Sequence, residues 1–94
     1  MRFEWDEEKA RNNLRNHRIS FDEAKTPFDD PLYVDFFDPD HSIDERRYII
    51  IGESERGRLL IVSYTERANR IRLISACKLT DSEQKGYEEG QTIQ

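Results

Sequence analysis

Cationic side chains are concentrated in one segment of a chain that is otherwise acidic. Residues 56–78 contain one acid, Glu66, and six cations, which are Arg56, Arg58, Arg67, Arg70, Arg72 and Lys78. The segment therefore has a net charge of +5, whereas the whole 94-residue chain has −5. Proteins that bind nucleic acid without a defined site are usually basic throughout, so a localised patch indicates a small site for phosphate groups.

This combination of side chains suits cleavage of an RNA phosphodiester without a metal ion. Attack by the 2′-hydroxyl requires a proton acceptor, a proton donor for the leaving oxygen, and cations that stabilise the transition state. Guanidinium groups match phosphate geometry and remain charged. We therefore predict that Glu66 is the general base and that Tyr64 or His17 is an auxiliary proton donor. The predicted phosphate clamp consists of Arg67, Arg70 and Arg72. Alternatively, Glu66 and its neighbouring arginines form only a surface ion pair on a hairpin.

Alternation along a strand predicted over residues 70–78 determines which side chains share a surface. Arg70, Arg72 and Lys78 fall on one face, and Cys77 falls on the other, which we expect to pack against the helices. If the register allows, Tyr64 and Glu66 of the preceding strand lie beside the two arginines. Tyr64 and Lys78 are then substrate-binding residues. Cys77 is expected to be a small apolar filler rather than a nucleophile.

Helix and strand signals predict a single domain, residues 1–94, of the α+β class. Asp6 is the expected N-cap of a helix that ends near residues 17–18, and Ser20 begins a second helix over 21–26. Thr80 begins a third helix that runs to about residue 89. Between them, strands are predicted over 32–37, 46–54, 58–66 and 70–78. The expected order is two N-terminal helices, an antiparallel sheet of three to four strands and a C-terminal helix, with the helices on one face of the sheet.

Composition excludes several other classes of protein. The single cysteine excludes internal disulfides and fits a reducing compartment. His17 and His41 lie on separate elements without metal-ligand spacing, and the loop containing Asp38, Asp40 and His41 is interpreted as a solvated turn. No nucleotide-binding motif occurs, so neither a metal nor a cofactor is expected. No apolar stretch approaches 18 residues, and the N-terminus does not resemble a signal peptide, so we expect a cytoplasmic protein without a membrane partner.

Segments spread over nearly the whole chain resemble the BrnT family of type II toxins. They are Phe3-Glu4-Trp5-Asp6-Glu7, Asn13-Leu14-Arg15-Asn16-His17, Ile19-Ser20-Phe21, Phe28-Asp29-Asp30-Pro31, Asp38-Pro39-Asp40-His41-Ser42, Glu45-Arg46-Arg47-Tyr48, Ile51-Gly52, Arg58-Leu59-Leu60, Tyr64-Thr65-Glu66-Arg67, Arg70-Ile71-Arg72-Leu73-Ile74-Ser75-Ala76 and Tyr87-Glu88. The resemblance implies a RelE-like endoribonuclease that inhibits translation by cleaving RNA. It also implies neutralisation by a BrnA-type ribbon-helix-helix antitoxin in a heterotetramer, which binds operator DNA through the antitoxin.

The same resemblance supports Glu66, Arg67, Arg70 and Arg72 as site residues. His17 matches the family's histidine at the end of the first helix, where it is either catalytic or satisfies the last helical carbonyl groups.

The chain departs from the family pattern at two positions. Arg18 replaces the usual glycine, so an arginine must enter a left-handed cap or the helix end must be rearranged. Cys77 replaces an arginine that usually follows the Ile-Ser-Ala motif. If that arginine binds RNA, this chain has lost a cation, and its alternative function is a catalytically weakened binding module that acts as antitoxin partner and operon corepressor. Direct DNA binding is disfavoured by the net charge of −5.

Overall fold

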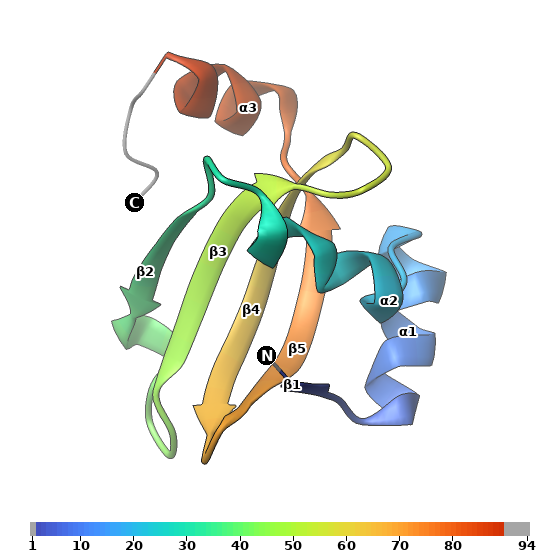
Figure 1. The fold of residues 1–94 in the computed structure, drawn as a ribbon, viewed down its shortest axis with the longest axis vertical. Helices are drawn as coiled ribbons and strands as arrows, with labels where there is room; N and C mark the ends of the chain where they lie inside the picture. The colour runs from blue at the N-terminus through green and yellow to red at the C-terminus, as the bar shows by residue number, and fades with distance from the viewer. Residues whose placement is uncertain (1, 90–94) are drawn as a thin grey trace.

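A five-stranded mixed sheet forms the centre of the fold, with strand order β1-β5-β4-β3-β2 (Figure 1). The computed structural model describes residues 2–89. Its elements are β1 (Arg2–Glu4), α1 (Glu7–His17), α2 (Phe21–Ala24), the 3₁₀ helix η1 (Thr26–Asp29), β2 (Val34–Asp38), the 3₁₀ helix η2 (Pro39–His41), β3 (Arg47–Glu53), β4 (Leu59–Arg67), β5 (Arg70–Lys78) and α3 (Asp81–Glu88). No helix among the described residues is long and apolar enough to cross a membrane.

The predicted α+β class and the antiparallel run from β2 to β5 are confirmed. The prediction missed β1, which pairs in parallel with the first three residues of β5 and makes the sheet mixed. Three residues directly before a helix are too few to show the alternation that identifies a strand.

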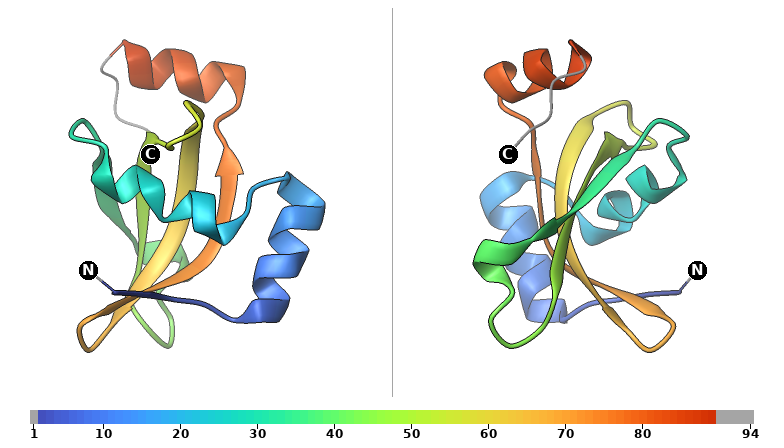
Figure 2. Two further views of the ribbon diagram at one scale, coloured as in Figure 1. Left: turned by 45° about the vertical axis from the view of Figure 1, so that its right-hand side comes forward. Right: turned by 90° about the vertical axis from the view of Figure 1, so that its left-hand side faces the viewer.

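The core lies between the sheet and the layer formed by α2 and η1. Helix α1 lies along β5, and α3 follows the end of β5, as the rotated views in Figure 2 show. Side chains from both layers are almost fully buried there, including Ile19, Phe21, Ile50, Leu60, Val62, Tyr64 and Leu73. We call the sheet face that α2 and η1 leave uncovered the open face.

A β-bulge in β5 reverses the alternation of side chains halfway along the strand. Tyr64 of β4 is opposite Leu73, whereas the preceding Ser63 is opposite Ser75, so Ile74 is the extra residue. One extra residue moves every later side chain to the other face. As a result Leu73 and Ala76 both point into the core, although an uninterrupted strand would place them on opposite faces.

The Asn13 side chain bonds the edge of β5 beyond the three residues that pair with β1. Its side-chain Nδ2 donates to the carbonyl oxygens of Ala76 and Ile19 at 2.8 and 2.9 Å. Its Oδ1 accepts from the backbone N–H of Ala76 at 3.0 Å. The buried amide therefore bonds β5 as a neighbouring strand would, and α1 covers this stretch of the sheet edge.

The ends of the helices follow the predicted capping residues. Asp6 accepts from the N–H groups of Glu8 and Lys9 at 2.8 and 3.1 Å, and Thr80 forms a complete capping box with Glu83. Ser20 accepts from the Glu23 N–H at 3.1 Å, but the Glu23 carboxylate is bonded elsewhere. The second helix ends at Ala24, earlier than predicted, and the 3₁₀ helix η1 begins at Thr26.

Arg18 adopts the left-handed conformation expected at a glycine cap, with φ 61°. An L-residue with a side chain loses about 1–2 kcal/mol of stability in this backbone region. Glycine avoids this steric cost, but part of the gain is offset because glycine loses more conformational entropy on folding. We expect Arg18→Gly to raise the free energy of unfolding by about 0.5–1 kcal/mol, measured by urea denaturation. The control Arg15→Gly, within the regular helix, should lower it by about 0.5–1 kcal/mol. A loss of stability in Arg18→Gly would contradict this account of the cap.

Candidate active site

A row of polar side chains crosses the open face, with one residue from each strand. The strand registers place Asp38 opposite Arg47, Arg47 opposite Thr65, Thr65 opposite Arg72, and Arg72 opposite Glu4. Side chains that are directly opposite one another share a face. The sheet therefore carries an arginine of β3 and one of β5 on the same face, on strands whose backbones are about 10 Å apart across β4.

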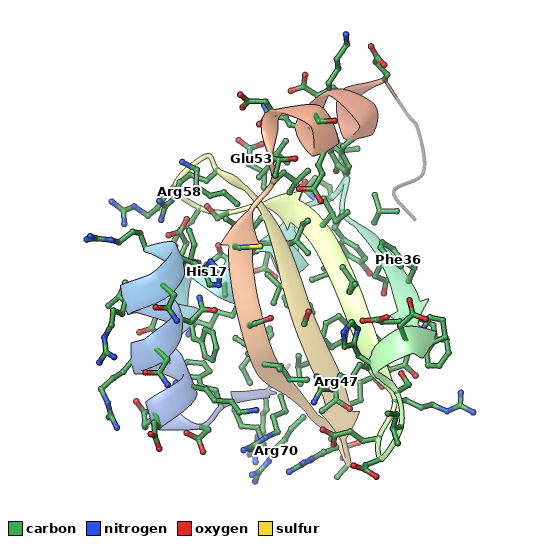
Figure 3. The ribbon with its side chains drawn as sticks, turned by 180° about the vertical axis from the view of Figure 1, so that it is seen from behind. His17, Phe36, Arg47, Glu53, Arg58 and Arg70 are labelled. Atoms are coloured by element: carbon green, nitrogen blue, oxygen red, sulfur yellow. The ribbon has the colours of Figure 1, made fainter. Side chains whose placement is uncertain are left out.

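Arg67 and Arg70 form the next row beside Arg72. They are opposite each other where β4 and β5 meet their turn, and Figure 3 shows Arg47 and Arg70 at the same end of the sheet. The side chains of Arg67 and Arg70 are 53% and 54% exposed, and that of Arg72 is 28% exposed. All of these groups can therefore be reached by a phosphate from solvent. We call Arg47, Arg67, Arg70 and Arg72 the arginine cluster.

Two carboxylates hold three members of the arginine cluster. Arg72 and Arg70 donate to Glu4 at 2.8 and 3.5 Å, and Arg67 donates to Glu45 at 3.1 Å. The hydrogen bond from Arg72 lowers the pKa of Glu4, so this carboxylate is ionised near neutral pH. Glu4 was not recognised from the sequence because β1 was not predicted. Its effect is to fix the direction of the Arg72 guanidinium.

Arg47 is the fourth cation of the cluster and was also missed. Its Nε is buried and has no hydrogen-bond partner among the described residues. Alternation within the predicted strand 46–54 places Arg47 on one face, but only the pairing of β3 with β4 shows that this face also carries Arg72. An unpaired buried donor is costly.

The structure corrects the predicted placement of Tyr64 and Glu66. Tyr64 is 4% exposed, lies in the core on the opposite face from Arg72, and donates to Asp35 at 3.3 Å. Burial raises its pKa well above the usual range for a phenol, with a smaller contribution from Asp35. Tyr64 is therefore a packed core residue rather than a substrate contact. Glu66 is exposed but is opposite Ile71, so its side chain leaves the sheet on the other face from the cluster.

His17 and Lys78 lie away from the arginine cluster. His17 is exposed at the last residue of α1, and Figure 3 shows it well separated from Arg70. Lys78 is the final residue of β5, eight residues after Arg70, which corresponds to about 26 Å along a strand. Arg58 is likewise at that end, where it pairs with Glu23. Three of the six cations in residues 56–78 therefore lie outside the arginine cluster, namely Arg56, Arg58 and Lys78.

Cys77 does not face the helices of the core, contrary to the prediction. The bulge at Ile74 places it opposite Ile61 on the open face, partly buried near α3. Burial raises the pKa of its thiol, with a smaller effect from Glu83. Cys77 is about 16 Å along β5 from Arg72, so an arginine at this position would not join the cluster directly.

No group of three or more His, Cys, Asp or Glu side chains within residues 2–89 is arranged to hold a metal ion. In the loop interpreted above as a solvated turn, two of the polar side chains pair with each other, since His41 Nδ1 lies 2.8 Å from Asp38 Oδ2.

Comparison with known proteins identifies a family and a related solved structure. A family model described as the ribonuclease toxin BrnT of type II toxin–antitoxin systems matches residues 5–83. The crystal structure of the Brucella abortus ribonuclease toxin BrnT superposes with a TM-score of 0.64 at 20% sequence identity, and the match covers 86% of this chain and 99% of that chain. At this identity the superposition shows a common fold. The comparison with curated proteins gave no match.

Proposed function

This chain belongs to the BrnT family of ribonuclease toxins of type II toxin–antitoxin systems, and we propose that it inhibits translation by cutting RNA without a metal ion. The proposal rests on one observation above all. Arg67, Arg70 and Arg72 share an accessible face of the sheet. Stabilising the extra charge on a phosphorane-like transition state is the part of the reaction that such a cluster can perform.

Within this proposal, the arginine cluster holds the scissile phosphate. The forks of Arg70 and Arg72 are oriented by Glu4, and fixed orientation allows charge to be stabilised without rearrangement during the reaction. Arg47 lies across Thr65 and offers a further donor. Glu4 acts as a positioning residue, because a carboxylate already bonded to two arginines and with a lowered pKa is a weak proton acceptor.

Glu66 remains the proposed general base. Its side chain forms no hydrogen bond or ion pair with any other described residue, so its lone pairs are free to take a proton. It lies next to Arg67 at the exposed end of the β4–β5 hairpin. Because Glu66 leaves the sheet on the face opposite the cluster, this role requires the RNA to bend around the end of the hairpin, so that the 2′-hydroxyl beside the bound phosphate reaches the carboxylate. His17, Tyr64 and Lys78 lie away from the arginine cluster and are given no role in this proposal.

Family membership implies an antitoxin partner. We propose that this partner is a BrnA-type ribbon-helix-helix protein, that two copies of each chain form the complex, and that operator DNA is bound by the antitoxin. Carboxylates of the antitoxin that cover the arginine cluster would exclude RNA by occupying the same charges, and would speed association.

Incubation of the purified chain with a defined RNA in excess chelator tests the chemistry. We expect cleavage that leaves a 2′,3′-cyclic phosphate, because the attacking group is the neighbouring 2′-hydroxyl. The same chain should arrest growth when it is expressed alone. A strict requirement for magnesium would overturn the proposed mechanism, and an absence of both cleavage and growth arrest would overturn the proposed function.

One observation favours a second function, that of antitoxin partner and operon corepressor with weakened catalysis. Three of the four clustered arginines are already paired with carboxylates of the same chain, so an RNA phosphate must compete with Glu4 and Glu45. Operator binding by the antitoxin, measured with and without this chain, separates the two functions. A catalytically silent chain that still strengthens operator binding would support the second function.

A further inference from the structure

Strand β2 forms one edge of the sheet and has no neighbour on its outer side among the described residues. Strand order places β3 on its inner side only. In an antiparallel pair, alternate residues direct their N–H and C=O groups away from the partner. Half of the backbone groups of Val34–Asp38 therefore face outward, ready to bond another strand. By contrast, β5 is covered at its own edge by β1 and by Asn13.

Exposed apolar side chains gather at this same edge. Six large hydrophobic side chains are exposed in the described part of the chain, and five of them are Leu32, Tyr33, Val34, Phe37 and Ile43. The most exposed are Ile43 at 90% and Leu32 at 78%. Figure 3 shows Phe36 at this edge of the open face. These five residues all fall within residues 32–43, on β2 or beside it, with Val34 and Phe37 on opposite faces of the strand. Such a concentration indicates an interaction surface rather than the scattered hydrophobic residues of an ordinary surface.

The charge of this edge identifies the kind of segment that fits it. Residues 26–45 contain seven acids and no lysine or arginine. The next cation along the chain, Arg46, lies over the Phe37 ring at 5.9 Å, on one face of β2. Natural edge strands are commonly protected from pairing by lysine, and β2 has none. Asp35 lies on β2 itself and is exposed. A second copy of the chain paired through the same edge would bring acids against acids, whereas a basic strand would be attracted.

We propose that the outer edge of β2 receives an extended segment of the antitoxin in which apolar residues alternate with lysine or arginine, added to the sheet as a further strand. Backbone hydrogen bonds supply affinity in this mode, and alternate side chains supply specificity. The identification of the partner as the antitoxin rests on the function proposed above. The added strand would lie about 10 Å from the strand that carries Arg47, so the antitoxin chain continuing from it can reach across the open face.

Hydrogen exchange of the complex between this chain and the antitoxin expressed with it tests the proposal. We expect the amides of residues 34–38 to exchange at least about tenfold more slowly in the complex than in the free chain. Val34→Lys and Ile43→Lys should each raise the Kd for the antitoxin about 10- to 100-fold, because each removes an apolar contact and repels a basic strand. The matched control is Leu14→Lys, which changes the remaining exposed hydrophobic residue, on α1, and should leave the Kd unchanged.

Three results would overturn the proposal. They are β2 amides that exchange equally fast with and without the antitoxin, equal antitoxin binding by Val34→Lys and Leu14→Lys, or a free chain that sediments as a dimer with β2 already protected. RNA cleavage by the same free variants keeps this test separate from the function proposed above. Val34→Lys should cleave RNA as the unmodified chain does. A chain that never cleaves RNA but is protected at β2 by the antitoxin would refute only the ribonuclease proposal.

Discussion

Arg72→Ala should lower the rate of RNA cleavage by about 10²–10³-fold, the usual effect of removing one donor that stabilises a developing oxyanion. Arg72 is the member of the arginine cluster whose direction is best fixed, because its hydrogen bond to Glu4 is 2.8 Å long and its side chain is only partly exposed. Arg72→Lys should recover a fraction of the activity, since it restores the charge but not the planar fork. Single-turnover rates on a defined RNA give the comparison directly.

Arg56→Ala is the matched control for the loss of one positive charge. Arg56 is exposed and lies between β3 and β4, at the end of the sheet away from the arginine cluster. Its removal changes the net charge equally but leaves the local field at the cluster almost unaltered, because exposed charges at this separation are screened by salt. If Arg56→Ala and Arg72→Ala reduced cleavage equally, general electrostatic attraction rather than a defined phosphate site would explain the activity. Thermal unfolding of both variants verifies that each remains folded.

Glu23→Ala should destabilise the fold by about 3–5 kcal/mol, because it leaves a partner of a buried ion pair uncompensated. The Glu23 side chain is 3% exposed, accepts from Arg58 Nε at 2.9 Å, and accepts from the Ser54 hydroxyl at 2.7 Å. These bonds connect α2 to the turn between β3 and β4. A domain of this size has a total stability of roughly 5–14 kcal/mol, so the variant should lose a large share of it in urea denaturation.

Two further variants identify the cause of that loss. Asp22→Ala, at the neighbouring exposed acid, removes only a surface ion pair with Lys25 and should change stability by less than about 0.5 kcal/mol. The double variant Glu23→Met/Arg58→Met should recover much of the stability, because paired buried charges can be replaced by apolar groups at little net cost. A Glu23→Ala variant as stable as Asp22→Ala would show that the pair does not hold α2 in place.

The Glu23–Arg58 pair also makes the free energy of unfolding depend on pH. The hydrogen bond from Arg58 lowers the pKa of Glu23 below its ordinary value of 4.5, against the opposing effect of burial. A carboxyl group with a lowered pKa in the folded state contributes stability fully above its unfolded pKa and loses that contribution as the pH falls. The difference in free energy of unfolding between the unmodified chain and Glu23→Gln should therefore be constant from pH 7 to pH 5 and shrink below about pH 4.5.

Local signals were sufficient to predict most elements of this fold. Asp6 and Thr80 are side chains that bond the first N–H groups of a helix, and these bonds depend only on residues within three positions. The strands from β2 to β5 follow from β-branched runs separated by turn residues. β1 could not be predicted in the same way, because its pairing with Arg70–Arg72 depends on a contact between opposite ends of the sequence.

The candidate site was harder to predict than the fold, and one residue accounts for much of the difference. The extra residue Ile74 inverts the second half of β5, which moves Cys77 to the open face and Ala76 into the core. No residue type in the strand signals this bulge. The assignment of Tyr64 to the open face failed because two faces of β4 carry apolar residues, and only the position of α2 and η1 decides which one is buried. Arg70 and Arg72 share one face, as predicted, because strand alternation before the bulge is intact.

The unequal edges of the sheet limit how copies of this protein can associate. One edge has open backbone groups along β2, while the opposite edge offers only the three residues of β1 before α1 and Asn13 close β5. Head-to-tail growth into a fibre requires an open edge at both ends of every subunit. Copies released from their partner can therefore pair through β2 two at a time, and among the described residues only the short strand β1 remains as an edge for further growth of the native sheet.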